Sequence, residues 1–274
     1  MIVACAIDRR FAELAGVMIY SLELNGSIPE ADIWIIGDGL RRSDKEKIQA
    51  CAKRKITFHD LDPSTLQHLA GFKTTSNWSR VAYARLFLPA LMPPTGNLLY
   101  LDADTMIKGS LRPLLEMDLS GKVIAAMGGP SKHNLPIGRA QDAFYFNSGV
   151  VLLNLKEWQS QELTLRALEL LKGRMFAFPD QDVLNLVADG QTVALDPKWN
   201  SQLAKATSDE VRIVHFTHAK PNTTYCVHPD KALFLEYRSR TPWANARLKT
   251  MWDKRLNRLL HSLRRKLKPS PKGR

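Results

Sequence analysis

Short apolar runs alternate with amphipathic segments along the first part of the chain. Residues 2–7, 32–37 and 55–61 have the length and composition of strands. Residues 11–25 and 43–54 lie between them and have the spacing of apolar positions that is typical of helices. Because strands and helices alternate, this part of the chain is predicted to form a doubly wound α/β domain.

The same criteria predict further elements downstream. The predicted strands are residues 98–101, 123–127, 144–155, 192–195 and 211–214. The predicted helices are residues 79–91, residues 161–173 and a helix that Asp180 would cap. Residues 128–142 show no period and are predicted to be a loop. Asn147-Ser148-Gly149 interrupts an apolar run, and a glycine there predicts a bulge or a close approach to the backbone.

Two carboxylates follow the apolar run at 98–101. Asp102 and Asp104 point to the same side of an extended chain, and Ala103 between them is small. Such a pair would repel itself unless a cation lay between the two groups. Oxygen ligands suit Mg²⁺ or Mn²⁺, which also binds phosphates. The motif is short, so the alternative that it only caps a turn stays open at this point.

Other polar side chains lie at the ends of predicted strands or among apolar neighbours. Asp8 follows the first strand and could bind a base or ribose, or only cap the next helix. Arg85 lies in an apolar segment and therefore requires a carboxylate or an anion as partner. His215 stands where a strand ends and could bind a metal, while Lys220 could reach a phosphate.

The positive charge of the chain is concentrated at its end. The chain of 274 residues has a net charge of +12, and residues 247–274 contain eleven lysines and arginines against one acid. Leu248, Trp252 and Leu256 begin an apolar stripe with helical spacing. We therefore divide the chain into a domain, residues 1–242, and a basic amphipathic tail, residues 243–274. The tail suits an anionic membrane surface; the alternative is a terminal helix docked on the domain. Nucleic-acid binding is not expected, because no motif that reads RNA or DNA accompanies the tail.

Cysteine usage and hydropathy indicate the compartment. The three cysteines, Cys5, Cys51 and Cys226, form no Cys-x-x-Cys pair, which favours a reducing environment. No stretch is apolar enough for a signal peptide or a membrane span. We expect a cytoplasmic protein that is peripheral on the inner face of the cytoplasmic membrane.

Six segments in this order resemble the family 8 glycosyltransferases, retaining and metal-dependent enzymes that include bacterial lipopolysaccharide galactosyl- and glucosyltransferases and glycogenin. The segments are IVACAID at 2–8, AYARLFLP at 82–89, LLYLDADTMI at 98–107, FNSGVVLLNL at 146–155, PDQDVLN at 179–185 and HFTHAKP at 215–221. The resemblance implies an α/β fold of the nucleotide-sugar transferase type (GT-A), with a mixed, mostly parallel sheet flanked by helices. It also implies UDP-glucose or UDP-galactose as the donor.

The resemblance also implies roles for individual residues. For the nucleotide, it implies that Ala6 and Asp8 contact uracil and ribose and that Lys220 contacts the diphosphate. For the metal, it implies that the Asp-x-Asp motif, Asp102, Ala103 and Asp104, lies at the cation. Asp102, Asp104 and His215 would be the ligands of Mn²⁺ or Mg²⁺. For the sugar, it implies that Arg85 holds the sugar or an acidic neighbour and that Asn147 and Ser148 line the pocket. Asp180 would bind sugar hydroxyls, and Gln181 would lie near the anomeric carbon. An amide is a poor nucleophile, so a covalent intermediate on Gln181 is not favoured, while Asp182 keeps that route open.

The resemblance leads to one main hypothesis and two alternatives. The main one is transfer of glucose or galactose to a bacterial glycan such as lipopolysaccharide. The segment from His215 to Lys220 is one residue shorter than the family pattern, with His218 and Asn222 at its glycine and tryptophan places. A UDP-sugar-binding protein with weakened catalysis is therefore the first alternative. A sugar nucleotidyltransferase is the second, although residues 8–16 lack the glycine-rich loop that it needs.

Overall fold

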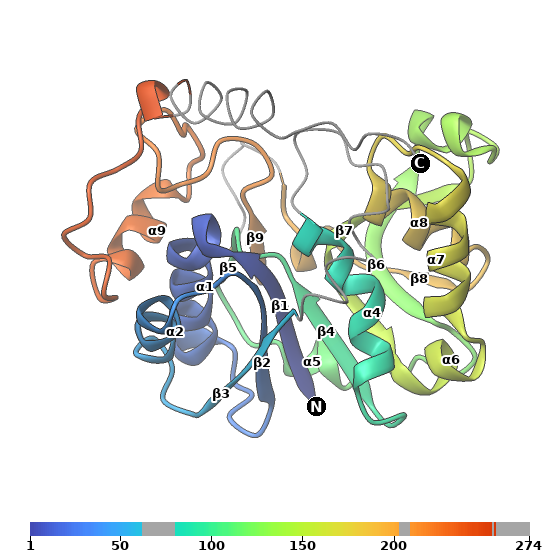
Figure 1. The fold of residues 1–274 in the computed structure, drawn as a ribbon, viewed down its shortest axis with the longest axis horizontal. Helices are drawn as coiled ribbons and strands as arrows, with labels where there is room; N and C mark the ends of the chain where they lie inside the picture. The colour runs from blue at the N-terminus through green and yellow to red at the C-terminus, as the bar shows by residue number, and fades with distance from the viewer. Residues whose placement is uncertain (62–79, 203–208, 254, 256–274) are drawn as a thin grey trace, which may run out of the picture.

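The computed structural model describes residues 1–61, 80–202, 209–253 and 255 (Figure 1). The strands are β1 (Ile2–Asp8), β2 (Asp32–Asp38), β3 (Ile56–Asp60), β4 (Asn97–Leu101), β5 (Thr105–Ile107), β6 (Ile124–Pro130), β7 (Phe144–Asn154), β8 (Thr192–Ala194) and β9 (Ile213–His215). The α-helices are α1 (Ala12–Asn25), α2 (Arg42–Gln49), α4 (Ala84–Leu91), α5 (Arg112–Leu115), α6 (Leu155–Ser160), α7 (Leu163–Gly173), α8 (Pro179–Val187) and α9 (Lys231–Arg238). Four 3₁₀ helices are η1 (Arg9–Phe11), η2 (Arg80–Tyr83), η3 (Lys132–Ile137) and η4 (Pro197–Trp199).

Seven strands form one sheet in the order β3-β2-β1-β4-β7-β6-β8. β7 runs antiparallel to its neighbours β4 and β6, and the other neighbouring strands of this sheet are parallel. The short strands β5 and β9 form a separate antiparallel pair. The predicted mixed, mostly parallel sheet flanked by helices is therefore confirmed.

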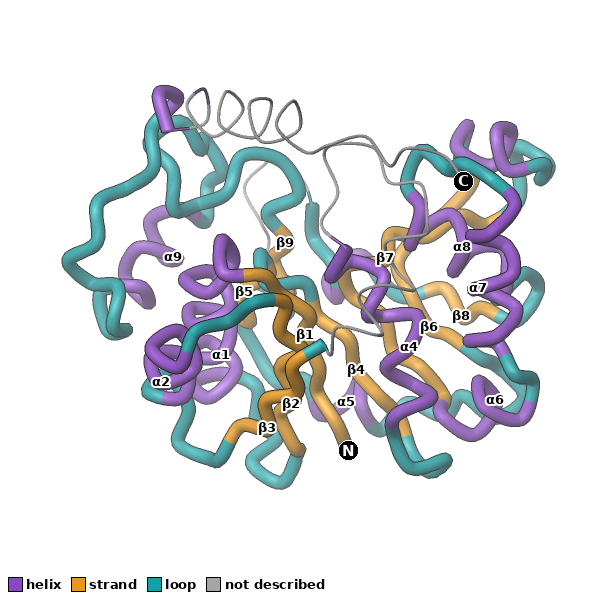
Figure 2. Tube along the Cα trace, viewed as in Figure 1, coloured by secondary structure: helices purple, strands orange, loops and turns teal. Residues whose placement is uncertain are grey.

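Helices cover both faces of the sheet, with α1, α2 and α9 on one side and α4, α6, α7 and α8 on the other (Figures 1 and 2). Each face buries alternate residues of the central strands. In β1, Val3 and Cys5 belong to the core under α1, whereas Ala4 belongs to the core under α4 and α7. In β7, Val150 faces the first core and Val151 the second. The central strands are thus buried on both faces, which explains why they read as continuous apolar runs.

Several elements differ from the sequence prediction. The second helix ends at Gln49 and not near residue 54, because the Gln49 side chain donates to Arg54 O (2.9 Å) and accepts from Ile56 N (2.9 Å), closing the turn into β3. Residues 128–142 are not simply a loop. β6 continues through Gly128 and Gly129 to Pro130, and η3 follows.

The prediction that Asp180 caps a helix is wrong. The cap of α8 is Phe178, and Pro179 takes the first helical position, where its missing N–H costs nothing. The Asp182 carboxylate, rather than that of Asp180, accepts a hydrogen bond from the Phe178 N–H (2.9 Å). The Asp180 side chain is therefore available for other partners.

The beginning of the basic tail lies on the domain. Residues 246–250 are not helical, and of the tail residues that the structure describes, 251–253 and 255 are helical. Lys249 forms an isolated parallel β-bridge with Thr223. The Arg238 guanidinium donates a hydrogen bond to Ala246 O (2.6 Å). Most of the predicted amphipathic helix lies outside the described residues. Among the helices that the structure describes, none is long and apolar enough to cross a membrane.

Candidate active site

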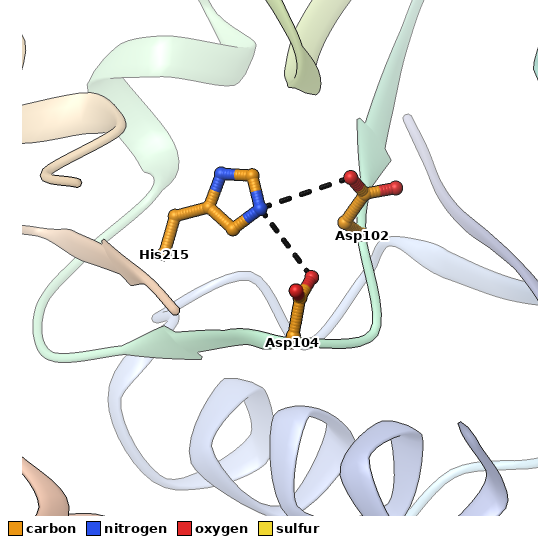
Figure 3. A group of neighbouring side chains, drawn as sticks. All are labelled: Asp102, Asp104 and His215. Atoms are coloured by element: carbon orange, nitrogen blue, oxygen red, sulfur yellow. Dashed lines mark ion pairs between the residues drawn. The ribbon is translucent and has the colours of Figure 1, made fainter. Parts of the chain in front are cut away.

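Three potential metal ligands meet at the carboxyl end of β4. Asp102 and Asp104 follow β4, and the pairing of Thr105 with His215 in β5 and β9 brings the histidine beside them. His215 Nε2 lies 3.8 Å from Asp102 Oδ2 and 3.4 Å from Asp104 Oδ1 (Figure 3). The ligand atoms of all three lie within 4.8 Å of one another. The structure therefore brings together the three residues that the sequence singled out as ligands.

The donor atoms of this group fit a divalent cation. The imidazole Nδ1 of His215 lies 2.9 Å from Asn200 Oδ1, and its Nε2 faces the two carboxylates. Two carboxylates and one imidazole are a donor set that suits Mn²⁺ or Mg²⁺ with phosphate oxygens as further ligands. Burial raises the pKa of Asp104, but His215 and Lys220 outweigh burial and hold that pKa below its usual range. Asp104 is thus an anion at neutral pH.

A glycine of β7 leaves space for the side chains of His215 and Asp102. A Cβ on Gly149 would lie 2.2 Å from His215 Cε1 and 2.7 Å from Asp102 Oδ2. Its carbonyl also accepts a hydrogen bond from the Asp102 N–H (2.7 Å). The close approach that the Asn147-Ser148-Gly149 interruption predicts is confirmed. The register between β6 and β7 also shifts here, so the predicted irregularity is present.

Arg85 links the Asp-x-Asp motif to α8. Its buried guanidinium lies over the ring of Tyr100. Nη2 donates to Asp102 Oδ1 (2.9 Å), and Nε forms an ion pair with Asp180 Oδ2 (3.0 Å). Nη1 donates to the carbonyl (2.7 Å) and to the hydroxyl (2.9 Å) of Ser148. The carboxylate partners that the sequence required for Arg85 are therefore two site residues. Desolvation lowers the Arg85 pKa, but the neighbouring acids, Asp102 first, outweigh it and keep the group charged.

The residues expected around the sugar lie together between β7 and α8. Gln181 Oε1 accepts hydrogen bonds from Asn147 Nδ2 (3.1 Å) and from the Ser148 N–H (3.2 Å). The Ser148 hydroxyl donates to Asp180 Oδ2 (3.3 Å). Burial raises the pKa of Asp180, and Arg85 opposes that rise. This group is a set of amide, hydroxyl and carboxylate atoms next to the candidate metal site.

Asp182 is occupied by partners inside the protein. Its Oδ1 accepts from the Tyr145 hydroxyl (2.5 Å) and its Oδ2 from the Phe178 N–H. The side chain is almost fully buried. The Tyr145 pKa is raised by burial and by the Asp182 charge, so the phenol stays protonated and donates. The expected alternative role of Asp182 as a nucleophile thus has to compete with these two hydrogen bonds.

Lys220 reaches the site in spite of the shortened segment. Its ammonium contacts Asp104 Oδ2 and donates to Phe216 O (2.8 Å). The following segment is anchored by Asn222, which is buried and donates to Glu13 Oε2 (2.7 Å). Asn222 therefore has its own buried partner in α1 in the place where the family pattern has tryptophan.

The residues expected at the nucleotide lie at the same edge of the sheet. β1 is parallel to β4 with Ala4 opposite Tyr100, so the carboxyl ends of the two strands, which Ala6 and Asp102 lie near, are at the same edge of the sheet. Asp8 caps η1 by accepting from the Arg10 N–H (2.8 Å) and pairs with the Arg10 guanidinium (2.6 Å). Its capping role, which the sequence left open, is therefore observed. Ala103, between Asp102 and Asp104 in the sequence, is buried. The contacts to uracil and ribose stay predictions.

Two site residues were missed in the sequence. Asn200 is fully buried and bonds both His215 and Asn147. It follows a 3₁₀ turn, where asparagine is common for local reasons, so no pattern marks it. Tyr145 precedes Asn147 by two residues on the same strand, and a hydroxyl in an otherwise apolar run was the signal available.

The family model described as glycosyl transferase family 8 matches residues 2–223. The chain belongs to glycosyl transferase family 8. Among its family 8 relatives, the lipopolysaccharide 1,2-glucosyltransferase of Escherichia coli strain K12 is 32% identical over 267 residues, which are 88% of this chain and 78% of that protein. The lipopolysaccharide 1,3-galactosyltransferase of Salmonella typhimurium strain LT2 is 26% identical over 269 residues, which are 90% and 80% of the two chains. The resemblance noted in the sequence is confirmed, and the protein is a glycosyltransferase.

A solved structure supports the fold. The galactosyltransferase LgtC, determined in complex with donor and acceptor sugar analogs, superposes with a TM-score of 0.76 and 24% identity. The match covers 89% of this chain and 99% of that one. The expected nucleotide-sugar transferase fold is therefore confirmed.

Proposed function

We propose that this glycosyltransferase moves a hexose, glucose or galactose, from UDP to a lipopolysaccharide-type glycan in a metal-dependent reaction that retains the configuration at the anomeric carbon. The observation that carries the proposal is the convergence of Asp102, Asp104 and His215 beside the amide and hydroxyl groups of β7 and α8. The names of the two lipopolysaccharide relatives support the acceptor class.

The residues of the site divide the work in the proposed reaction. Asp102, Asp104 and His215 would hold a divalent cation, whose positive charge would offset the charge of a diphosphate leaving group. Lys220 contacts Asp104 and adds a second positive charge to the site. Its attraction to the β-phosphate becomes stronger as negative charge develops there in the transition state. Arg85 orients Asp102 and Asp180 and also donates to the carbonyl and the hydroxyl of Ser148.

The sugar is expected to lie over the side chains between β7 and α8. Asp180 accepts a hydrogen bond from Ser148, and its burial leaves it suited to sugar hydroxyls rather than to bulk water. Gln181 presents an amide beside this pocket. Because an amide is a weak nucleophile, the proposal assigns Gln181 to positioning of the reacting centre and not to a covalent intermediate.

The decisive measurement is calorimetric titration of UDP-glucose and UDP-galactose, with and without Mn²⁺. We expect one donor to bind in the presence of Mn²⁺, and we expect Asp104→Asn and Asp102→Asn to lose the metal-dependent part of the affinity. Asp32→Asn is the matched control, because Asp32 is exposed at the opposite, amino end of β2. Equal binding by wild type and Asp104→Asn would contradict the proposal. Normal metal-dependent binding with no turnover on any acceptor would favour the weakened UDP-sugar-binding protein.

The basic tail is proposed to hold the enzyme on the anionic inner face of the cytoplasmic membrane, where a glycolipid acceptor is presented. Residues 256–274 contain seven lysines and arginines and no acid. Charge of this density is attracted to anionic headgroups within about a Debye length of the surface. The cytoplasmic, peripheral location is part of the same proposal.

A further inference from the structure

A continuous chain of hydrogen bonds joins the sugar pocket to the metal ligands. Its six members lie on β7, α8, β9 and the turn after η4. In order they are Asp182, Tyr145, Gln181, Asn147, Asn200 and His215, which we call the relay. Each link is 2.5–3.1 Å long. Amide side chains have a donor end and an acceptor end, so such a chain has a direction that its fixed neighbours determine.

The direction is fixed at the sugar-pocket end by groups that cannot reverse. The Asp182 carboxylate only accepts, so the Tyr145 hydroxyl donates to it and accepts from Gln181 Nε2 (3.0 Å). The backbone N–H of Ser148 only donates, and it points at Gln181 Oε1. Both neighbours therefore demand the same orientation of the Gln181 amide, and its Oε1 accepts from Asn147 Nδ2.

The same logic continues to the metal ligand. The backbone N–H of Gly149 donates to Asn147 Oδ1 (3.0 Å), which confirms that this atom is the oxygen. Asn200 must then present its Nδ2 to Asn147 Oδ1 (3.0 Å) and its Oδ1 to His215. His215 Nδ1 therefore carries a proton and donates to Asn200, and Nε2, which faces Asp102 and Asp104, is the nitrogen left for a metal.

We propose that Asn200 is a positioning residue that fixes His215 in its metal-binding tautomer, and that the relay ties this ligand to the Gln181 amide. The inference rests on the proposed function, because it concerns the same cation site. An imidazole that binds a metal through one nitrogen usually donates its other N–H to an oxygen of the protein, which sets both tautomer and ring orientation. Here that oxygen belongs to a side chain whose other end contacts the sugar pocket.

The buried setting makes Asn200 suited to this role. Asn200 has no exposed surface, and His215 is almost fully buried. Buried polar groups that lose a partner are costly, so each amide is held in the single orientation that satisfies its neighbours. Movement of Gln181 on donor binding would change Asn147 and then Asn200, so the metal site and the sugar pocket are expected to order together.

The test uses the full chain and two variants of Asn200. In metal-free protein, ¹⁵N NMR of histidine-labelled samples reports the tautomer of His215, with His215→Ala for assignment. Wild type is expected to carry a proton on Nδ1. Asn200→Ala is expected to populate the Nε2–H form and to weaken Mn²⁺ binding about 10- to 100-fold in calorimetric titrations.

Asn200→Asp separates the two ends of the relay. A carboxylate still accepts from His215 Nδ1, so the tautomer and the Mn²⁺ affinity are expected to be kept. It cannot donate to Asn147 Oδ1, so kcat for sugar transfer should fall while Mn²⁺ binding persists. Tyr145→Phe is the control at the far end; it should leave the His215 tautomer unchanged, because the Gly149 N–H still orients Asn147.

The outcomes distinguish this inference from the proposed function. A purely structural role for Asn200 would lower the unfolding midpoint of Asn200→Ala and leave the tautomer on Nδ1 with unchanged Mn²⁺ affinity, which would overturn the inference. Absence of Mn²⁺ binding by wild type would overturn the proposed function, while the NMR measurement would still decide whether Asn200 sets the tautomer.

Discussion

A single guanidinium holds together two carboxylates that would otherwise repel each other. Arg85 pairs with Asp102, which follows β4, and with Asp180 from α8, and it also donates to the carbonyl and the hydroxyl of Ser148. Breaking a buried ion pair by removal of one partner leaves an uncompensated charge, whereas removal of both partners is much less costly. The energetic role of Arg85 can therefore be measured as a difference between variants.

Arg85→Met should lower the free energy of unfolding by about 3–5 kcal/mol, because Asp180 would remain buried without its cation. Asp180→Asn in the same background should recover part of that loss. Urea unfolding of wild type, both single variants and the double variant gives the coupling. Arg42→Met is the control, since that arginine is exposed, and its effect should stay within about 0.5 kcal/mol. Strictly additive losses for Arg85 and Asp180 would contradict the pairing.

At the residue scale, the site residues that could be predicted from the sequence are those at the ends of strands. Asp102, Asp104 and His215 each follow or end a strand, so the topology of the fold brings them to one edge. Asn200 and Tyr145 were missed for a physical reason. Their roles depend on the hydrogen-bond partners of their side chains in the folded protein. A pattern of apolar and polar residues gives no information on these partners.

β7 organises the site at the scale of one element. Within a few residues it supplies Tyr145 and Asn147 to the relay, the Ser148 hydroxyl to Arg85 and Asp180, and the Gly149 backbone to Asp102. A strand that is antiparallel to both neighbours brings its beginning to the edge where β4 ends. Small shifts of this strand should therefore alter both halves of the site.

Gly149→Ala should weaken Mn²⁺ binding by at least about tenfold, because the added Cβ would force His215 and Asp102 apart. The measurement is calorimetric titration with Mn²⁺ alone. The matched control is Gly129→Ala on the neighbouring strand β6, where an added Cβ meets nothing within 4 Å. If both variants bind Mn²⁺ like wild type, Gly149 does not position the ligands.

Element prediction succeeded where the apolar period was long and failed where local side-chain contacts decided the boundaries. The strands at 2–8 and 97–101 and the helix at 12–25 were found from pattern alone. The end of α2 depends on the Gln49 side chain, and the start of α8 on Asp182 reaching back to Phe178. Contacts of this kind are specific to the folded chain and cannot be read from periodicity.

At the scale of the whole molecule, a buried ionic contact joins the two ends of the domain. Glu13 of α1 accepts hydrogen bonds from Arg238 of α9 (2.6 Å) and from Asn222 (2.7 Å). Arg238 also donates to Ala246 O, and Lys249 pairs with the backbone at Asn222. The segment that begins the basic tail is therefore integrated with the segment that carries Lys220. A truncation that tests the tail should begin beyond residue 255.

Removal of residues 256–274 should release the protein from anionic lipid vesicles and leave Mn²⁺-dependent donor binding unchanged. Seven positive charges are lost, while the contacts of residues 243–249 with the domain are kept. Vesicle sedimentation at two salt concentrations measures the effect, since the attraction is screened by salt. Neutral vesicles and a full-length variant with glutamine at those seven positions are the controls. Retention on anionic vesicles by the truncated chain would show that the domain surface, and not the tail, binds lipid.

The order of the elements along the chain has a consequence for biosynthesis. β8, the last strand of the large sheet, ends at Ala194, whereas His215 arrives later on β9 in the separate small sheet. Synthesis delivers the chain from its N-terminus. Every strand of the large sheet has therefore been made before His215, the third proposed metal ligand. A cation that needs all three residues could bind only after that point, so it would not assist folding steps that take place before residue 215 is made.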